Sequence, residues 1–335
     1  MFVPLSLPSP SPDWKQFDLA GWLHTTFGWN LPFPLHITAY AVCILVGIVV
    51  AVWWTSARLT KRGGEPGIVL DIALWTVPLG IIGARAYHVL THPNDYFGAG
   101  KNLGEVIAIW DGGNAIFGSI IGGAVGILIA CQISGVRFWS FADALAPGML
   151  AAQALGRLGN YFNQELFGQP TDLPWGLQID RPNPAIPIGL PASTLFHPTF
   201  LYEIIWNVFG IVLLLLLERQ YQLRWGRMIA FYFIWYGIGR SWFESIRLDP
   251  SEVFFGIRSN VWAAFASIIV GLVILIVQRA RHRGLEPSVY RPGREWSPAP
   301  SGVDSDETYS DSDDSGNVAA NTPELAATSG AGSTS

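Results

Sequence analysis

The sequence predicts an all-α polytopic membrane protein. Half of its 335 residues are hydrophobic and only 13% are charged, whereas a soluble domain carries about a quarter charged residues. Several apolar runs approach or exceed the roughly 18 residues needed to cross a bilayer. At these lengths we expect helices, because a bilayer offers the backbone no partners and each segment must satisfy its own hydrogen bonds.

About seven transmembrane helices are expected. In chain order they cover residues 35–57, 67–90, 114–134, 140–158, 199–217, 227–245 and 260–278. The predicted organisation is an external N-terminal segment, a seven-helix transmembrane domain with an external loop, and a tail; these cover residues 1–34, 35–283 (loop 159–198) and 284–335.

Basic residues in the loops predict the orientation, because cytoplasmic loops are enriched in Lys and Arg. Ten follow the first, third, fifth and seventh segments: Arg58, Lys61, Arg62, Arg137, Arg219, Arg224, Arg227, Arg279, Arg281 and Arg283. Five lie on the other side: Lys15, Lys101, Arg181, Arg247 and Arg258. The N-terminus is therefore predicted outside and the C-terminus inside.

The third segment carries glycines at four-residue steps, Gly118, Gly122 and Gly126. Small residues at this spacing allow two helices to approach closely. Helix packing is the preferred interpretation, ahead of a ligand contact.

The two cysteines, Cys43 and Cys131, each lie inside an apolar run. We expect them to be small helix residues rather than a disulfide or a thiolate metal site.

The segment from Gly284 onward is acidic, with nine Asp or Glu against two Arg. It has few large apolar residues, so it is predicted to bury too little surface to offset its ordering entropy. Residues 284–335 are therefore expected to be a disordered cytoplasmic tail.

Arg85, Arg157 and Arg240 lie within the predicted spans. A charged residue at the centre of a bilayer costs about 2.5–3.5 kcal/mol on insertion scales. The acidic candidates to pair with them are Glu203 and Glu244, and Arg247 adds a further cation. This surplus of arginine near the outer ends of the spans predicts an anionic ligand. Arg binds phosphate through a planar fork, and the abundant phosphate of a membrane is the lipid headgroup.

The stretch "GRLGNYFNQELFG", residues 156–168, follows the fourth segment. It is predicted to be the outer end of that helix turning into the external loop. Helical spacing places Arg157, Asn160 and Gln164 on one face.

This stretch resembles the signature of the prolipoprotein diacylglyceryl transferase family, which begins Gly-Arg-x-Gly-Asn and continues through Asn, Glu and Gly. Five further stretches follow the order of that family: "AYAVCILVG" (39–47), "GARAYHVL" (83–90), "IWDGGNAIFGSIIGG" (109–123), "HPTFLYE" (197–203) and "YGIGRSWFESIR" (236–247). The resemblance covers about residues 30–280.

The resemblance implies a multi-pass enzyme of the bacterial plasma (inner) membrane. Such an enzyme moves the diacylglyceryl group of phosphatidylglycerol to the lipobox cysteine thiol of a prolipoprotein signal peptide, forming a thioether and releasing glycerol phosphate. The partners implied are phosphatidylglycerol, prolipoprotein signal peptides and the lipid bilayer. No metal, other cofactor or nucleic acid is expected.

The resemblance also implies roles for individual residues. Arg240 and Tyr40 match the expected catalytic positions, and Arg157 matches the arginine that holds the lipid phosphate. The complete set expected to bind phosphatidylglycerol is Arg157, Asn160, Asn163, Glu165, Gly168, Arg85, Tyr87, His197, Glu203, Glu244 and Arg247. A cation near the incoming thiol would lower its pKa, and cations near the phosphate would stabilise the leaving group.

One position departs from the family pattern. Many members have His-Gly-Gly in the third-segment motif, whereas this chain has Phe117 in place of that histidine. Phenylalanine accepts no proton, so the base is left open between Arg240 with Tyr40 and another group, with His197 and His88 as candidates. His88 and His92 also form an HxxxH pair, which lacks the glutamate of the zinc protease motif.

Two other classes of protein are less favoured. A lipid or anion transporter would use the same arginines, but many transporter folds contain internal repeats, and the sequence shows none. A structural membrane scaffold does not explain the buried arginines.

Overall fold

The structure is a computed structural model. It describes residues 6–30, 36–98, 100–109, 112–113, 115–249 and 251–297. Residues Met1–Trp296 form one compact unit. The second unit is Ser297–Ser335, and all of it beyond Ser297 lies outside the described residues, together with most of the predicted acidic tail.

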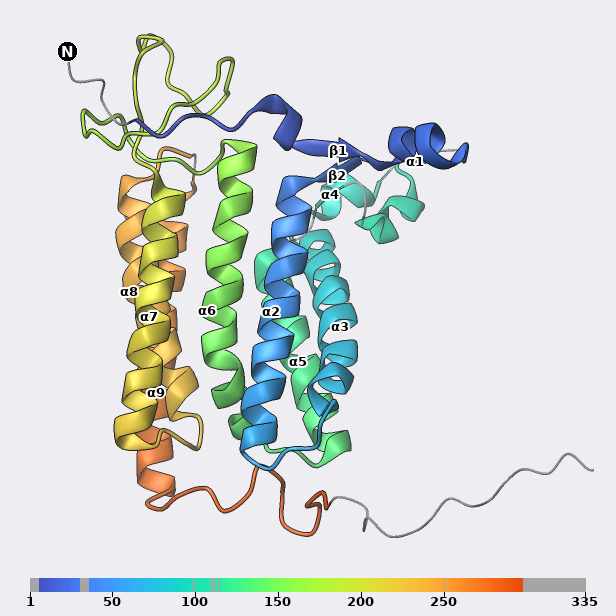
Figure 1. Cartoon of the computed structure of the whole chain (residues 1–335), viewed down its shortest axis with the longest axis vertical. Coiled ribbons are helices and arrows are strands. Elements are labelled where there is room, and N and C mark those ends of the chain that lie inside the picture. The colour runs from blue at the N-terminus through green and yellow to red at the C-terminus, as the bar shows by residue number, and fades with distance from the viewer. Residues whose placement is uncertain are drawn as a thin grey trace, which may run out of the picture. The chain divides into compact units, whose positions relative to one another are not determined.

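Seven helices of 19 to 26 residues dominate the described part of the first unit and lie side by side (Figure 1). They are α2 (Ala39–Lys61), α3 (Ile68–Thr91), α5 (Ile116–Ser134), α6 (Phe138–Asn163), α7 (Thr199–Tyr221), α8 (Arg227–Ile246) and α9 (Ser259–Arg281). Each overlaps one of the seven predicted segments. Five of them, α2, α3, α5, α7 and α9, are long and apolar enough to cross a membrane. The other two, α6 and α8, carry more polar residues, and their crossing stays a prediction.

Several short elements, which were not predicted from the sequence, precede or connect the long helices. They are η1 (Pro12–Trp14), β1 (Gln16–Asp18), α1 (Leu19–Phe27), β2 (His36–Thr38), α4 (Pro93–Tyr96), η2 (Leu103–Ile107), β3 (Val253–Phe254) and β4 (Ile257–Arg258). β1 pairs antiparallel with β2, with Phe17 opposite Ile37, and β3 pairs antiparallel with β4. The expectation of an all-α chain is therefore right for the bundle and incomplete for its periphery.

Glycines bring α3 and α5 into close contact. A Cβ added at Gly118 would collide with Gly83 and Tyr87, and one added at Gly126 would lie 2.7 Å from the carbonyl oxygen of Trp75. Gly122 faces Leu79 in the same way. The prediction that this glycine series packs helices is confirmed.

A buried carboxylate joins α6 to α8. Asp143, which is fully buried, accepts hydrogen bonds from the backbone amides of Gly226, Met228 and Ile229 at 2.8, 2.9 and 3.1 Å. These amides lie at the start of α8, where the first turn of a helix lacks intrahelical acceptors. Asp143 therefore caps α8 from within the bundle.

The N-terminal segment contacts the loop between α6 and α7. The backbone amide of Leu7 donates to the carbonyl oxygen of Gly176 at 2.9 Å, and the amide of Gln178 donates back to Leu7. Both regions were predicted to be external, and they lie at the same end of the bundle (Figure 1).

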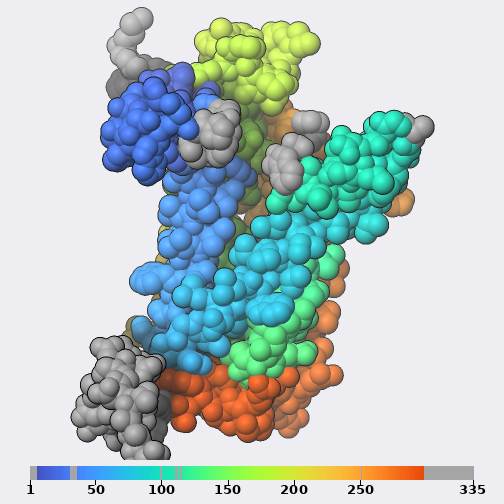
Figure 2. All heavy atoms as spheres, turned by 90° about the vertical axis from the view of Figure 1, so that its right-hand side faces the viewer, coloured from blue at the N-terminus to red at the C-terminus, as the bar shows by residue number. Residues whose placement is uncertain are grey.

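The predicted start of the disordered tail is wrong. Val289 and Tyr290 are buried in a cluster with residues of α2, α3, α5 and α6. The amide of Arg137 donates to the carbonyl oxygen of Val289 at 2.8 Å, and the amide of Glu65 donates to the Tyr290 hydroxyl at 2.9 Å. In Figure 2 this segment belongs to the orange atoms beneath α2 and α3. Two buried apolar side chains and hydrogen bonds to the bundle hold this segment, although the composition of the whole tail concealed them.

Candidate functional site

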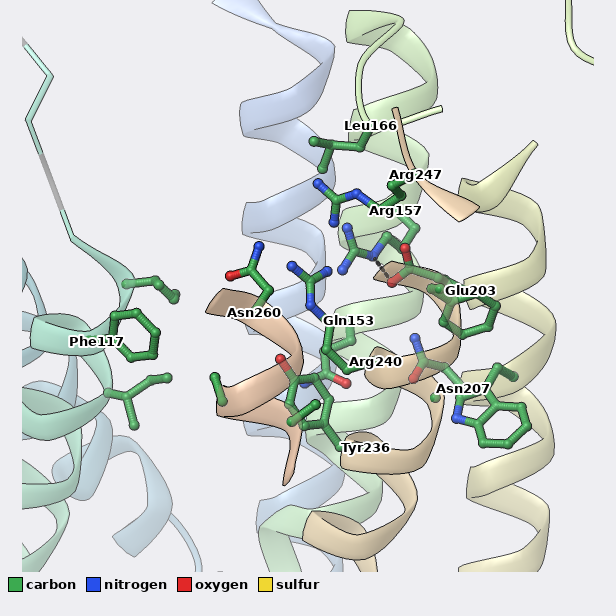
Figure 3. A pocket seen from close by; sticks show the side chains of 17 residues that line it. Phe117, Gln153, Arg157, Leu166, Glu203, Asn207, Tyr236, Arg240, Arg247 and Asn260 are labelled. Atoms are coloured by element: carbon green, nitrogen blue, oxygen red, sulfur yellow. Dashed lines mark ion pairs between the residues drawn. The ribbon is translucent and has the colours of Figure 1, made fainter. Parts of the chain in front are cut away.

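A cavity of about 320 Å³ lies between α5 on one side and α6, α7, α8 and α9 on the other (Figure 3). Its polar lining consists of Gln153, Arg157, Glu203, Asn207, Tyr236, Arg240, Arg247 and Asn260. Its apolar lining includes Ile116, Phe117 and Ile120 of α5. The cavity therefore has cations on one wall and hydrocarbon on the facing wall.

Arg157 is held by one side chain of α7 and one of its own helix, α6. Its Nε lies 2.7 Å from Oε2 of Glu203 on α7, and its Nη1 donates to Oδ1 of Asn160 at 3.1 Å. Asn160 in turn donates to Glu165 at 2.8 Å. The predicted shared face of Arg157 and Asn160 is confirmed by this contact.

Gln164 does not share that face. It ends α6 in the left-handed conformation, with φ 52°, and donates to Oδ2 of Asp180 at 2.6 Å. The hydrogen bond from Ser9 is the largest influence that lowers the pKa of the Asp180 carboxyl, and the hydrogen bond from Gln164 is the second. α6 ends at Asn163, one residue before Gln164, because the chain turns there into the external loop. Gln164 therefore does not continue the helical face that Arg157 and Asn160 share.

Arg240 is anchored by Glu244, one turn later on α8. The Nη2 atom of Arg240 lies 3.0 Å from Oε2 of Glu244, whose side chain is fully buried. The same carboxylate also receives Arg258 Nε at 2.9 Å and Asn260 Nδ2 at 3.0 Å. Arg247 approaches it at 3.6 Å.

Arg157 and Arg240 pair with Glu203 and Glu244, the two acids that the sequence analysis named as candidate partners. The cluster nevertheless keeps one positive charge in excess, with four arginines and three carboxylates: Arg157, Arg240, Arg247, Arg258, Glu203, Glu244 and Asp249. Within the described part of the chain, Nη2 of Arg157 and both Nε and Nη1 of Arg240 have no hydrogen-bond partner. These are the donors that remain for an anion.

Arg247 lines the cavity, but its donors are largely used. Its Nε and Nη2 form a two-point contact with Asp249 at 2.7 and 2.9 Å. Arg258 also donates to the carbonyl oxygen of Arg247 at 2.9 Å. These contacts fix the segment that follows α8.

Arg85 does not belong to this site, which corrects the expectation for this residue. It is 7% exposed, and its guanidinium donates to the backbone carbonyl groups of Glu105, Val106, Gly112 and Gly113. The charge is therefore satisfied by the loop around η2, which the sequence analysis did not anticipate, and its donors are used.

Other expected site residues lie around the cavity without lining it. The ring of Tyr40 packs against Gly159, between Arg157 and Asn160; a Cβ on that glycine would lie 2.7 Å from Cδ2 of Tyr40. Asn163 donates to Glu165 at 3.3 Å.

Gly168 and His197 belong to the loop structure above the site. The amide of Gly168 donates to the carbonyl oxygen of His197 at 2.9 Å, and a Cβ on Gly168 would lie 2.7 Å from Cβ of His197. The His197 ring lines a separate apolar cavity with Trp175 and Trp242, and its Nδ1 lies 3.2 Å from the Tyr202 hydroxyl.

Comparison with known proteins agrees with this arrangement. The sequence profile described as "Prolipoprotein diacylglyceryl transferase" matches residues 27–277. The chain belongs to the prolipoprotein diacylglyceryl transferase family. A relative from Leifsonia xyli subsp. xyli (strain CTCB07), named phosphatidylglycerol–prolipoprotein diacylglyceryl transferase, is 60% identical over 311 residues, 90% of each chain.

More distant relatives carry the same name. The protein of Bifidobacterium longum (strain DJO10A) is 41% identical over 297 residues, 82% of this chain and 89% of its own. One of Streptomyces coelicolor, whose name ends in "transferase 2", is 43% identical over 253 residues, 76% and 79% of the two chains.

In this member of the diacylglyceryl transferase family, Phe117 lies across the cavity from the arginines (Figure 3). Its ring is 46% exposed and lies 6.3 Å, between centroids, from that of Tyr87, which itself is outside the cavity lining. Neither His88 nor His197 lines the cavity. His88 instead stacks on His92 at 4.4 Å. The two histidines considered as substitute bases are therefore not part of the cavity lining.

The sequence analysis missed several polar residues of this transferase-family site. Gln153, Asn207 and Tyr236 line the cavity with Arg157, Glu203 and Arg240, each four residues away on the same helix. Residues four apart are neighbours on a helix surface. A search at that spacing from each expected charge would have found all three.

Proposed function

We propose that this chain transfers the diacylglyceryl group of phosphatidylglycerol to the lipobox cysteine of prolipoproteins, the first step of lipoprotein maturation. The observation that carries the proposal is the pairing of Arg157 and Arg240 in one cavity, each held by a carboxylate and each with free donors. The names of the relatives support the same activity.

The lipid phosphate binds between the free donors of Arg157 and Arg240. Charge-assisted hydrogen bonds of this kind are about twice as strong as neutral ones. The side chain of Asn207 and the amide oxygen of Gln153, whose nitrogen donates to the Tyr232 hydroxyl at 2.7 Å, face the glycerol headgroup, and Ile116 and Ile120 on the facing helix contact the acyl chains. The site thus suits an amphipathic anion and explains why one wall is apolar.

The reaction is a displacement at carbon. The thiolate sulfur of the substrate cysteine attacks the phosphate-bearing carbon of the diacylated glycerol, and a C–S bond forms as the C–O bond between that carbon and the phosphate breaks. The electron pair of that bond leaves with the phosphate oxygen, and the product is glycerol phosphate. Fixed cations at the phosphate stabilise the negative charge that develops in the transition state.

Glu203 is the proposed acceptor of the thiol proton. It is the carboxylate side chain among the described residues that line the cavity, and its Oε2 already faces Arg157. The neighbouring arginines favour the thiolate, because a nearby cation lowers the pKa of a thiol. Arg240 retains the catalytic role that the resemblance implies. Tyr40 is proposed to position Arg157 by packing against Gly159 on α6.

The remaining expected residues are proposed as supports of the lipid-binding helices. Asn160, Asn163 and Glu165 hold the end of α6, and Glu244 with Arg247 holds the end of α8. Gly168 gives the backbone room beside His197. Tyr87 contacts Phe117.

We place the seven helices α2, α3 and α5–α9 across the bacterial plasma membrane, with the N-terminus outside and the C-terminus inside. The asymmetry of the basic residues supports this orientation. Arg157 and Arg240 then lie toward the outer leaflet, near the loop 159–198, where an exported signal peptide is reached.

The proposal is tested with purified protein, phosphatidylglycerol and a synthetic lipobox peptide. Mass spectrometry is expected to show a diacylglyceryl adduct on the cysteine, and no adduct on a matched peptide with serine at that position. The variant Arg240→Gln is expected to form no product. Binding of phosphatidylglycerol without any adduct would instead indicate a transporter or a lipid-binding protein.

A further inference from the structure

A second cationic cavity lies at the opposite ends of α8 and α9 from the site described above. It is lined by Arg227, Arg279, His282 and Arg283, together with the apolar side chains of Ile276 and Ala280. Arg227 begins α8, and the other three cationic or titratable residues lie at or just beyond the end of α9. The two helices pack against each other along their length.

The arginines of this cavity lack acidic partners in the described part of the chain. The Nε atom of Arg227 is buried without a hydrogen-bond partner, while its Nη2 donates to the carbonyl oxygen of His282 at 2.5 Å. Arg279 and Arg283 form no ion pair with any described residue.

Three other arginines at the same end of the bundle pair with a carboxylate, Glu218. Arg58 and Arg62 contact Glu218 at 2.9 and 2.6 Å, and Arg224 contacts the same carboxylate at 3.1 Å. Each of those three arginines contacts a carboxylate of the protein. Within the described residues, Arg227, Arg279 and Arg283 contact none.

The approach to the cavity is apolar. α9 is one of the helices apolar enough to cross a membrane, and Ile269, Val273 and Ile276 are exposed on it. Ile276 reaches the cavity itself, beside Arg279. An acyl chain lying along this face of α9 would therefore contact apolar side chains, and the headgroup at its end would lie beside the arginines.

We propose that this cavity binds the phosphate of an anionic phospholipid from the leaflet opposite the substrate. The guanidinium groups supply planar forks for a phosphodiester, and exposed side chains of α9 supply the surface for an acyl chain. The apolar lining favours a lipid over an acidic peptide such as residues 304–324 of this chain. The inference rests on the proposed membrane orientation and is independent of the transfer reaction.

The test counts bound lipid by native mass spectrometry of detergent-purified protein titrated with dioleoyl-phosphatidylglycerol or dioleoyl-phosphatidylcholine. An Arg157→Gln background removes a principal contact of the substrate site from the comparison. The double variant Arg279→Gln with Arg283→Gln is expected to bind one equivalent of phosphatidylglycerol at least tenfold more weakly. Arg281→Gln, on the same turn but outside the cavity, is the matched control and is expected to bind as the background does.

The proposal would be overturned if the double variant bound phosphatidylglycerol as tightly as the Arg281→Gln control does. It would also be overturned if the double variant lost affinity for phosphatidylcholine and for phosphatidylglycerol to the same extent. A phosphatidylglycerol equivalent that appears only after residues 298–335 are removed would show that the acidic tail occupies the cavity, which also overturns it. Product formation is measured separately with Arg279→Gln and Arg283→Gln introduced into the protein that keeps Arg157, and it is expected to match the wild-type rate, so failure of one proposal is distinguishable from failure of the other.

Discussion

The carboxylate of Asp143 accepts a hydrogen bond of 2.9 Å from the backbone amide of Met228, and this contact fixes α8 against α6. Both helices run from this contact toward the cavity. At 1.5 Å per residue, Arg157 lies about 21 Å along α6 from Asp143, and Arg240 lies about 18 Å along α8 from Met228. The relative height of the two arginines therefore depends on a buried contact far from the site.

Asp143→Ala is expected to destabilise the protein by about 3 kcal/mol or more, because it leaves three buried amides without an acceptor. Asp143→Asn keeps one acceptor oxygen and is expected to cost about 1–2 kcal/mol. Asp71→Asn, an exposed acid in α3, is the control. Thermal unfolding in detergent measures all three. Equal melting temperatures for Asp143→Ala and the control would show that the cap does not hold α8.

Arg157→Lys is expected to lose most transfer activity, about tenfold or more, while the protein folds and inserts normally. Lysine keeps the charge but lacks the fork that contacts Glu203, Asn160 and a phosphate at once. Initial rates with phosphatidylglycerol and a lipobox peptide provide the measurement. Near-normal turnover by the lysine variant would show that charge alone is sufficient at this position.

The sequence predicted the long helices and the principal charges because hydrophobic length and signature residues are local properties. Arg157 with Asn160 and Arg240 with Glu244 follow from helical spacing. Arg85 was misplaced because its partners are backbone carbonyl groups of a loop, and carbonyl groups carry no sequence signal.

Contacts between distant segments also escaped prediction. Arg258 at the end of β4 and Asn260 at the start of α9 both contact Glu244. Tyr290 packs near Glu65, 225 residues away in sequence. Such pairs depend on how the helices pack in three dimensions, and neither periodicity nor composition predicts that packing.

Glu203→Gln is expected to lower the rate at pH 7 by roughly tenfold or more and to make it rise with pH until about 8.5, where the substrate thiol ionises without help. Phe117→Leu is the matched control from the facing wall and is expected to retain most of the wild-type rate at every pH. Initial rates between pH 6 and 9 test both variants. If His197→Ala abolishes activity and Glu203→Gln does not, the base is the histidine.

Removal of residues 298–335 is expected to leave melting temperature and activity unchanged, whereas removal of 285–335 is expected to destabilise the protein by about 3–6 kcal/mol. The longer deletion exposes the surfaces that Val289 and Tyr290 cover, and burying one large apolar side chain contributes about 1.5–3 kcal/mol. Thermal unfolding compares the two truncations. Identical stability of both would mean that the docked segment contributes nothing.

The proposed reaction is a displacement that joins lipid and thiol in one event, and the stoichiometry of its products tests it most directly. Purified protein is incubated with phosphatidylglycerol and a lipobox peptide, and thioether-linked peptide and glycerol phosphate are quantified over time. The expected result is one glycerol phosphate per modified cysteine, with neither product when serine replaces the cysteine. Glycerol phosphate released without modified peptide, or lipid bound without either product, would contradict the claim.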